Sequence, residues 1–411
     1  MLHTQAKLEA LLDQHRGIPF DLRDWAGKTY HAGAGAAQFV IHFRTRQSFL
    51  RSLLETSLGF GESYATGEVT VEGDLEVAVI ALVETYLRLD PRGWVPGWFR
   101  RLLGRSLARQ KGDIEHHYGL GNRFYQFFLG QKLQYSCAYF RRGDESLDLA
   151  QEQKIEHIAA KLDLRPGQRL LDVGCGWGHL MFHAAETHGV QCLGLTLCDN
   201  QATYIREQAK SRGLPVEVQV RNFLESERRA EWDRVVSVGM LEHVGQANLD
   251  RYFEALRAVL KPRGVTLVHS ISQMREIPGT DPFLQKHIFP GYWFPSAEGV
   301  AQRAVRRGLH VVDVENLRRH YALTIRRWRE NFLGNHDAIK SVTGFGEPFL
   351  RMWDFYLCCA IAGFHTAQTH LMQWVLSNGP NDSYPLTRDF LYRAPAHRVA
   401  AGVFSGGGRE G

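Results

Sequence analysis

Three glycines in alternating positions follow a short apolar run and mark where this chain could do chemistry. The stretch RLLDVGCGWGHL, residues 169–180, contains Gly174, Gly176 and Gly178. Glycine has no Cβ, so a ligand can lie directly against the backbone of such a loop. A dinucleotide-binding loop would need its third glycine at position 179, where this chain has histidine. The spacing therefore favours a ligand without a pyrophosphate.

The apolar run and the glycine spacing form the nucleotide-loop pattern of S-adenosylmethionine (SAM) methyltransferases. SAM needs close backbone approach to its amino-acid and ribose parts, which glycines allow. Asp172, at the end of the expected strand, could accept a hydrogen bond from the SAM ammonium group. Many such enzymes hold the ribose with an acid after the second strand. Here that strand ends in Thr196 and Leu197, so Gln201 is the candidate. A glycine-rich turn without a ligand is the alternative.

Short apolar segments alternate with segments of helix length from about residue 150 onward. Expected strands lie at 169–174, 191–196, 216–220, 233–239 and 265–271, and expected helices include 199–212 and 248–260. The alternation predicts an α/β fold of the Rossmann-like class I SAM methyltransferase type. Its mostly parallel seven-stranded sheet would carry helices on both faces. The first section of the chain mixes helical and strand-like patterns, which predicts a smaller N-terminal mixed α/β domain.

Composition narrows the class of protein. The 411 residues carry a formal net charge of +5, too mild to indicate nucleic acid. None of the six cysteines stands in a CxxC pair, so we expect no metal site, and free thiols favour a reducing compartment. The N-terminus lacks the pattern of a signal peptide, and the longest apolar run, 77–87, is too short to span a bilayer. These features predict a cytoplasmic location.

Eight segments, in order along nearly the whole chain, resemble the cyclopropane-fatty-acid synthase family, which includes the mycolic-acid cyclopropane synthases. One such motif alone would be weak, but eight in the family's order are highly specific. The segments are GFGESYATGEV (59–69), HYGLGNRFYQFFLGQKLQYSCAYF (117–140), LLDVGCGWG (170–178), GLTLCDNQ (194–201), VSVGMLEHVG (236–245), LVHSIS (267–272), DPFLQKHIFPG (281–291) and HYALTIRRW (320–328).

The resemblance implies a reaction on lipid. The family transfers a methylene group from SAM to the cis double bond of an unsaturated acyl chain in membrane phospholipid, giving a cyclopropane fatty acid. The reaction passes through a carbocation that a bound bicarbonate deprotonates. It therefore needs a methyl donor held in line, a base beside the new methyl group, and apolar walls. Carried over motif by motif, the implied bicarbonate site comprises Cys137, Glu242, His269, Ile271 and Tyr321.

The same motifs imply a SAM site built from several strand ends. Tyr135 and Ser136 would cover the methionine end, and Arg221 and Asn222 would lie by the adenine, where Phe223 could pack. The full implied set is Tyr135, Ser136, Asp172, Gly174, Cys175, Gly176, Trp177, Gly178, Thr196, Leu197, Gln201, Arg221 and Asn222.

The residues of the bicarbonate site also have ordinary structural interpretations. Cys137 could be a small buried residue, and Glu242 could act on a helix dipole. His269 could be a hydrogen-bonded core histidine, and Tyr321 could be a strand aromatic. For each residue alone these alternatives stay open, whereas the ordered set of motifs favours the functional interpretation.

The chain departs from the family pattern at three positions. Gly119 stands where the family usually has Asp, Arg123 where it usually has an acid, and Ala360 where it usually has Cys. The thiol of Cys359 comes one residue early, which turns a helical side chain by about 100°. Some members use their own carboxylate in place of bicarbonate. The corresponding position here is Ile361, so we expect bicarbonate.

We expect three parts: an N-terminal lipid- or membrane-associated domain and linker at 1–110, the methyltransferase domain at 111–400, and a disordered tail at 401–411. Residues 94–111 combine aromatic and basic side chains, which suits an anionic lipid surface, although a solvated linker helix is an equal alternative. Residues 281–296 could line an acyl channel or form a packed connection. The expected partners are unsaturated phospholipid acyl chains on the inner face of the cell membrane, with a possible homodimer and no nucleic acid.

Two other functions remain open. A lipid C-methyltransferase of the same family would quench the same cation differently and give a methyl-branched or methylated unsaturated chain. A non-catalytic SAM- or lipid-binding protein would have no use for the Glu242, His269 and Tyr321 set. A nucleic-acid methyltransferase is disfavoured, because the chain reads GMLEHVG after the fourth strand instead of an NPPY-type motif.

Overall fold

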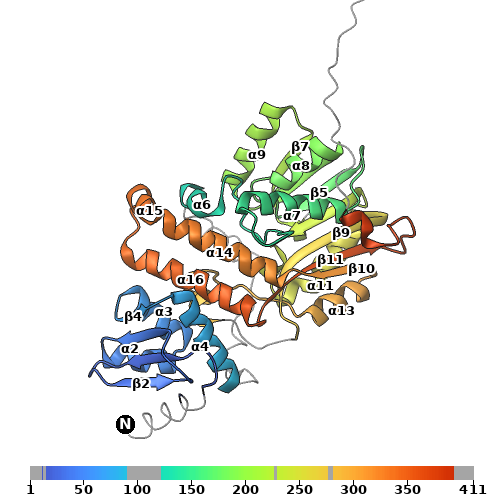
Figure 1. Cartoon of the computed structure of the whole chain (residues 1–411). Helices are drawn as coiled ribbons and strands as arrows, with labels where there is room; N and C mark the ends of the chain where they lie inside the picture. The colour runs from blue at the N-terminus through green and yellow to red at the C-terminus, as the bar shows by residue number, and fades with distance from the viewer. Residues whose placement is uncertain (1–11, 13–14, 90–121, 226–228, 276–280, 393–411) are drawn as a thin grey trace, which may run out of the picture.

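The computed structural model describes residues 12, 15–89, 122–225, 229–275 and 281–392 (Figure 1). The expected membrane segment 94–111, Gly119, the boundary near residue 110 and the tail 401–411 lie outside these residues.

The N-terminal part is a small mixed α/β domain, as predicted. Its four strands are arranged in the order β2-β1-β3-β4, with β1 and β3 parallel and the other pairs antiparallel. Buried and partly exposed residues alternate along β3, so one face of the sheet packs on the helices. The elements are β1 (Phe20–Arg23), β2 (Thr29–Ala32), β3 (Phe39–Phe43), α2 (Arg46–Leu54), α3 (Ser57–Ala65), β4 (Val69–Glu72) and α4 (Leu75–Leu89).

The larger part contains a mostly parallel seven-stranded sheet in the order β10-β11-β9-β8-β5-β6-β7. Six strands run in the same direction, and β11 runs antiparallel to both of its neighbours, β9 and β10. The strand order reverses beside β5, and ligands of such sheets bind at that point. The strands are β5 (Arg169–Val173), β6 (Gln191–Thr196), β7 (Val216–Val220), β8 (Trp232–Val238), β9 (Leu260–Ser272), β10 (Leu309–Asn316) and β11 (His370–Asn378).

Helices cover both faces of this sheet, which confirms the predicted fold class. Alternate residues of one strand face different hydrophobic clusters: Leu170 packs with residues of α7, α8 and α9, and Leu171 packs with residues of α11 and α13. The helices are α6 (Asn122–Leu129), α7 (Leu147–Lys161), α8 (His179–His188), α9 (Asp199–Arg212), α10 (Leu241–Val244), α11 (Leu249–Val259), α12 (Pro282–His287), α13 (Ala297–Arg306), α14 (Arg318–Gly334), α15 (His336–Thr343) and α16 (Glu347–His365). Three 3-10 turns complete the order: η1 (Phe223–Glu225), η2 (Gln246–Asn248) and η3 (Arg388–Leu391).

The structure settles the local conformation of two segments that the sequence left open. Tyr321, for which a place on a strand was one alternative, lies in the first turn of α14. The aromatic segment after residue 281 begins with a short helix, α12, whose Phe283 is fully buried. Asp281 starts this helix by accepting a hydrogen bond from the backbone N–H of Leu284 at 2.9 Å.

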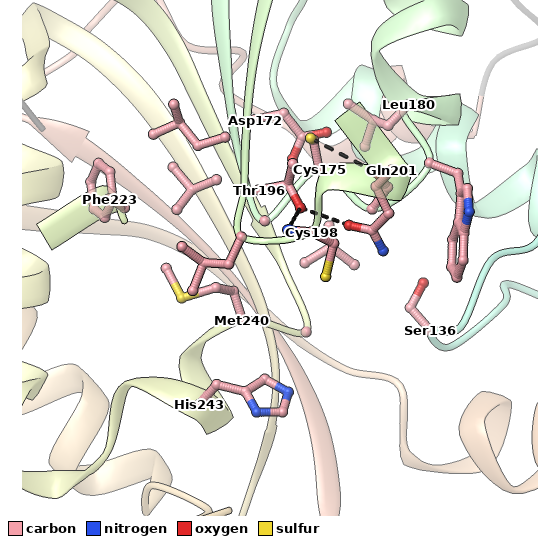
Figure 2. Close-up of a pocket in the computed structure, with 18 of the residues that line it drawn as sticks. Ser136, Asp172, Cys175, Leu180, Thr196, Cys198, Gln201, Phe223, Met240 and His243 are labelled. Atoms are coloured by element: carbon pink, nitrogen blue, oxygen red, sulfur yellow. Dashed lines mark hydrogen bonds between the residues drawn. The ribbon is translucent and has the colours of Figure 1, made fainter. Parts of the chain in front are cut away.

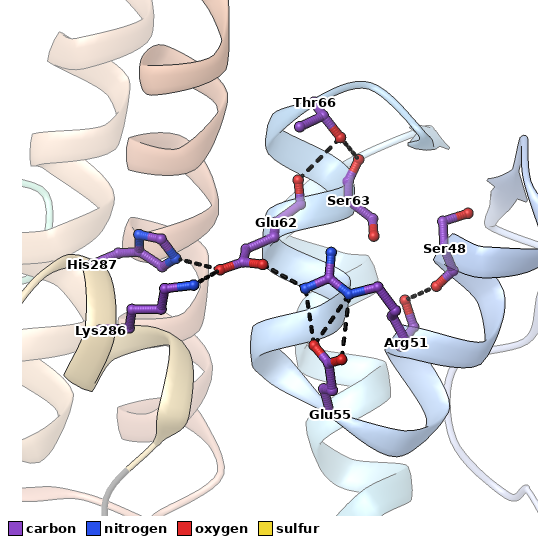
Figure 3. A network of polar contacts seen from close by, with 9 residues as sticks. Ser48, Arg51, Glu55, Glu62, Ser63, Thr66, Lys286 and His287 are labelled. Atoms are coloured by element: carbon purple, nitrogen blue, oxygen red, sulfur yellow. Dashed lines mark hydrogen bonds and ion pairs between the residues drawn. The ribbon is translucent and has the colours of Figure 1, made fainter.

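The N-terminal domain lies against α16 and α12 (Figure 1). Figure 3 shows the polar part of the contact, in which the Glu62 carboxylate of α3 accepts from Lys286 Nζ at 2.5 Å and from His287 Nε2 at 2.9 Å. Arg51 of α2 donates to the other oxygen of Glu62. Beside this network, Phe60 of α3 and Phe355 of α16 pack with ring centroids 5.5 Å apart. The domains therefore share one continuous core.

Within the part of the chain that the structure describes, no helix combines the length and the apolar composition that a membrane span requires. The same residues contain no group of three or more His, Cys, Asp or Glu side chains arranged to hold a metal ion.

Candidate active site

A pocket opens at the carboxyl ends of β5, β6, β7 and β8, where the strand order reverses (Figure 2). Twelve of the thirteen residues predicted to hold SAM line it, and the exception is Gly178. The twelve are Tyr135, Ser136, Asp172, Gly174, Cys175, Gly176, Trp177, Thr196, Leu197, Gln201, Arg221 and Asn222. The topology thus brings together residues spread over almost ninety positions of sequence.

The glycine loop between β5 and α8 serves two purposes. Gly174 and Gly176 line the pocket with positive φ angles of 83° and 53°. Gly178 instead ends the loop as the residue before α8, with φ 78°. A Cβ on Gly178 would lie 2.9 Å from Ile205 Cγ1, so this glycine lets the loop pack on α9.

A short hydrogen-bond chain joins the end of β6 to α9 on one side of the pocket. Thr196 Oγ1 donates to Gln201 Oε1 at 2.7 Å and accepts from the backbone N–H of Cys198 at 3.1 Å (Figure 2). Because the amide oxygen of Gln201 is engaged, its amide N–H groups are the donors that this side chain offers to a ligand. Beyond β7, Asn222 Oδ1 accepts from the backbone N–H of Leu224, which fixes the turn carrying the buried Phe223.

Two buried titratable side chains, one on β5 and one on α7, line another part of the pocket. Asp172 is 3 % exposed, and burial raises the pKa of its carboxyl to about 7. Lys154 of α7 is 4 % exposed, and burial lowers the pKa of its ammonium group to about 8. Its Nζ donates to Ser136 Oγ at 2.9 Å.

The five residues predicted to form the bicarbonate site lie beside the pocket rather than in its lining. Glu242 Oε1 accepts from the backbone N–H of Ile271 at 2.6 Å, so α10 is joined to the end of β9. His269 precedes Ile271 by two residues and therefore lies on the same face of β9. Gln373 of β11, directly opposite His269, donates its side-chain N–H to His269 Nδ1 at 3.1 Å, which leaves the ring hydrogen on Nε2.

Glu242 and His269 are both buried with unused hydrogen-bonding atoms. Among the described residues, Glu242 Oε2 and His269 Nε2 have no hydrogen-bond partner. Burial raises the pKa of Glu242 to about 7 and lowers the pKa of His269 well below its usual value. His269 is therefore a neutral imidazole at neutral pH, and Glu242 exchanges a proton near that pH.

Cys137 and Tyr321 belong to a mainly aromatic cluster around α14 and α16. Cys137 is fully buried, and burial raises the pKa of its thiol, which makes it a poor nucleophile. The ring of Tyr321 packs 4.6 Å from Phe364 and 5.9 Å from Trp328. Nearby, the hydroxyl groups of Tyr135 and Tyr356 share a hydrogen bond of 2.7 Å.

Some pocket residues were missed by sequence reasoning. These are chiefly Lys154, His179, Cys198, Met240 and His243. Lys154 could have been found, because it recurs with Gln151, Ile158 and Lys161 at helical spacing on the buried face of α7. Met240 and His243 flank Glu242 in a motif already singled out.

Two of the three positions where the chain departs from the family pattern, Arg123 and Ala360, fall within the described residues, and neither lines the pocket. Arg123 is exposed on α6. Cys359, Ala360 and Ile361 lie on α16, where Ile361 is fully buried in the aromatic cluster.

Comparison with known proteins agrees with this architecture. The structure of the cyclopropane synthase MmaA2 from Mycobacterium tuberculosis superposes with a TM-score of 0.62 at 30% identity, covering 65% of this chain and 98% of that one. That of mycolic acid cyclopropane synthase CmaA1 complexed with SAH and CTAB gives a TM-score of 0.61 at 31% identity, covering 65% and 98%. The fold, the glycine loop and these likenesses define a SAM-dependent methyltransferase.

Sequence comparison gives the family. Residues 105–374 match the model of the mycolic acid cyclopropane synthetase family, and the chain belongs to that family. Residues 7–86 match a domain of unknown function (DUF7884). A probable fatty acid methyltransferase from Pseudomonas putida is 32% identical over 92% of this chain and 97% of its own length. The cyclopropane-fatty-acyl-phospholipid synthase of Escherichia coli (strain K12) is 32% identical over 86% and 92%.

Proposed function

We propose that this enzyme transfers a methylene group from SAM to the cis double bond of an unsaturated acyl chain in membrane phospholipid, giving a cyclopropane fatty acid. The observation that carries the proposal is the buried pair of unpartnered atoms, Glu242 Oε2 and His269 Nε2, beside the SAM pocket. Buried polar atoms are almost always hydrogen-bonded, so unpartnered ones call for a ligand. The similarity to the phospholipid synthase of E. coli supports the choice of substrate.

The pocket residues fit SAM. The Cβ-free backbone of Gly174 and Gly176 allows close approach, and Asp172 and Lys154 offer opposite charges to an amino-acid zwitterion. When bound, SAM would supply an electrophilic methyl carbon, which a poorly nucleophilic double bond can attack only if both are held in line. Tyr135 and Ser136 line the pocket, and Tyr135 also packs against the aromatic cluster, so both would contribute to that alignment.

The residues beside the pocket fit a small anionic base such as bicarbonate. His269 offers the N–H of a neutral imidazole, Tyr321 a hydroxyl, and Glu242 a carboxyl whose pKa of about 7 suits holding or releasing a proton. Bicarbonate would supply the group that removes a proton from the carbocation. Burial raises the pKa of the Cys137 thiol, so no thiolate, the stronger nucleophile, would stand beside such a cation.

The surroundings of this site favour a hydrophobic substrate. Trp328, Ile361 and Leu371 are buried in the same cluster as Cys137, and the partly buried Tyr321 and Ile271 pack against it. Aromatic and aliphatic walls exclude water and offer no nucleophile to a carbocation. We infer that the acyl chain is presented at the membrane surface and that the enzyme docks there peripherally, on the cytoplasmic side.

A second candidate function is the methylation of the acyl chain without ring closure. It is favoured by the likeness to the probable fatty acid methyltransferase of P. putida, which spans nearly the whole length of both chains. The two reactions share the first step and differ in which proton the cation loses.

The deciding experiment incubates the enzyme with SAM and liposomes of cis-monounsaturated phospholipid, with and without bicarbonate. Gas chromatography–mass spectrometry then reads the acyl esters. A product heavier by one CH2 that resists hydrogenation, and that falls when bicarbonate is removed, is expected. A heavier product that takes up hydrogen would replace the ring assignment with the second candidate. A Cys359→Ala variant serves as the matched control and should keep the activity, because no role is assigned to this thiol.

A further inference from the structure

Lys154 is a buried lysine that the fold alone does not explain. It lies in the middle of α7, is 4 % exposed, and contributes to the wall of the SAM pocket. Removing an ammonium group from water is unfavourable unless a partner in the protein or a ligand compensates for the lost hydration.

The hydrogen-bond partner of the Lys154 ammonium group is a neutral hydroxyl, which compensates for a buried charge less well than a carboxylate would. Within the described residues its Nζ makes one hydrogen bond, to the neutral Ser136 Oγ, and no carboxylate lies within 4.0 Å. Lys161, about two turns further along the same buried face of α7, shows the contrast, because its Nζ donates to the Glu315 carboxylate at 2.6 Å. An ammonium group has three N–H donors, so Lys154 keeps two for a ligand.

Asp172 completes the arrangement from the other side. Its carboxylate lines the same pocket and makes no hydrogen bond or ion pair within the part of the chain that the structure describes. It interacts electrostatically with Lys154 at a distance too long for an ion pair. The pocket therefore presents one ammonium group and one carboxyl group, both buried and both without an ionic partner among the described residues.

We propose that Lys154 binds the α-carboxylate of the amino-acid part of SAM, with Asp172 receiving the α-ammonium group. A zwitterionic amino acid is the ligand chemistry that satisfies both charges at once. Ser136 then acts as a positioning residue, because its hydroxyl holds the Lys154 ammonium group at the pocket wall. This inference stands on the SAM site alone and does not depend on which lipid product forms.

Calorimetric binding of two ligands to the full chain tests the proposal. S-adenosylhomocysteine carries the carboxylate, and its decarboxylated form, in which a 3-aminopropyl thioether replaces the homocysteine, keeps only the ammonium group. In Lys154→Met, the affinity for S-adenosylhomocysteine should fall about 10- to 100-fold, as expected for the loss of a charge-assisted hydrogen bond. The affinity for the decarboxylated ligand should stay within about twofold or improve, because a nearby positive charge is removed.

Two controls keep the outcome clear. Lys210→Met, an exposed position on α9, should leave both affinities unchanged. If Lys154→Met does not fold, the wild-type chain still decides, because it should bind S-adenosylhomocysteine at least tenfold more tightly than the decarboxylated ligand. Equal losses for both ligands in the variant, or equal affinities in the wild type, would overturn the proposal without touching the assignment of the lipid reaction.

Discussion

We expect the buried Glu242 carboxyl to lower the free energy of unfolding at neutral and higher pH, where it would have to carry a charge in the folded chain. Burial raises the pKa of its carboxyl from 4.5 to about 7, so the folded chain holds a proton that the unfolded chain releases. Relative to high pH, protonation of this carboxyl therefore stabilises the folded chain. The contribution is fully present below pH 4.5 and is lost as the pH rises through 7. Glu242→Gln should raise the free energy of unfolding by about 2–3 kcal/mol at pH 8 and by almost nothing at pH 4. Thermal unfolding of the ligand-free protein at both values measures this.

The same variant should form no lipid product, because an amide cannot exchange the proton. Glu207→Gln, exposed on α9, is the matched control and should change neither stability nor product. An unchanged unfolding temperature at pH 8 would mean that Glu242 is not destabilising in the folded chain. Greater stability combined with lost activity is the signature of a functional residue.

At the scale of one element, the β5–α8 loop separates two kinds of glycine. A Cβ at Gly178 would meet Ile205 at 2.9 Å, whereas a Cβ at Gly176 would have nothing within 4 Å and would face the pocket. Both substitutions cost about 1 kcal/mol for a left-handed backbone. Gly178→Ala should lower the unfolding temperature further, with a small effect on S-adenosylhomocysteine affinity. Gly176→Ala should instead lower that affinity by tenfold or more. Reversed effects would contradict the assignment of roles.

The elements show what sequence can predict. Helix α9 falls at the expected 199–212, and the five expected strands appear within a few residues, because apolar periodicity and turn residues act locally. Tyr321 could not be placed on a helix in the same way, since its segment mixes aromatic and basic residues. Lys154 shares the helical spacing of the buried face of α7, but a lysine in a helix normally points to water, so the sequence alone offers little reason to single it out.

For the whole molecule, we expect the ion pairs of Glu62 to stabilise the contact between the N-terminal domain and α12. Burial alone would raise the pKa of Glu62, but hydrogen bonds from Lys286, Arg51 and His287 lower it to about 2. The resulting stability is present above pH 4.5 and is lost as the pH falls toward 2. Glu62→Gln should cost about 1–3 kcal/mol at pH 7. The Glu55 carboxylate is more exposed, and Arg51 is its one partner in this network. Glu55→Gln should therefore cost less than about 1 kcal/mol. Urea unfolding measures both variants. Equal losses of unfolding free energy in Glu62→Gln and Glu55→Gln would show that Glu62 does not stabilise this contact more than its exposed neighbour.

Close packing at Gly61 makes the same interface sensitive to a single methyl group. A Cβ on this α3 residue would lie 2.5 Å from the ring of Phe283 and 2.6 Å from that of Phe355, and both rings are buried. Replacing a glycine inside a helix by alanine normally stabilises it by about 1 kcal/mol. Gly61→Ala should do the opposite and separate α3 from α12 and α16, which hydrogen exchange of those helices would report. Gly334→Ala in α14 is the control, because nothing lies within 4 Å of its new Cβ and it should be neutral or stabilising. If the Gly61→Ala variant keeps native exchange in α12 but loses lipid product, the contact serves the reaction and not the docking of the domain.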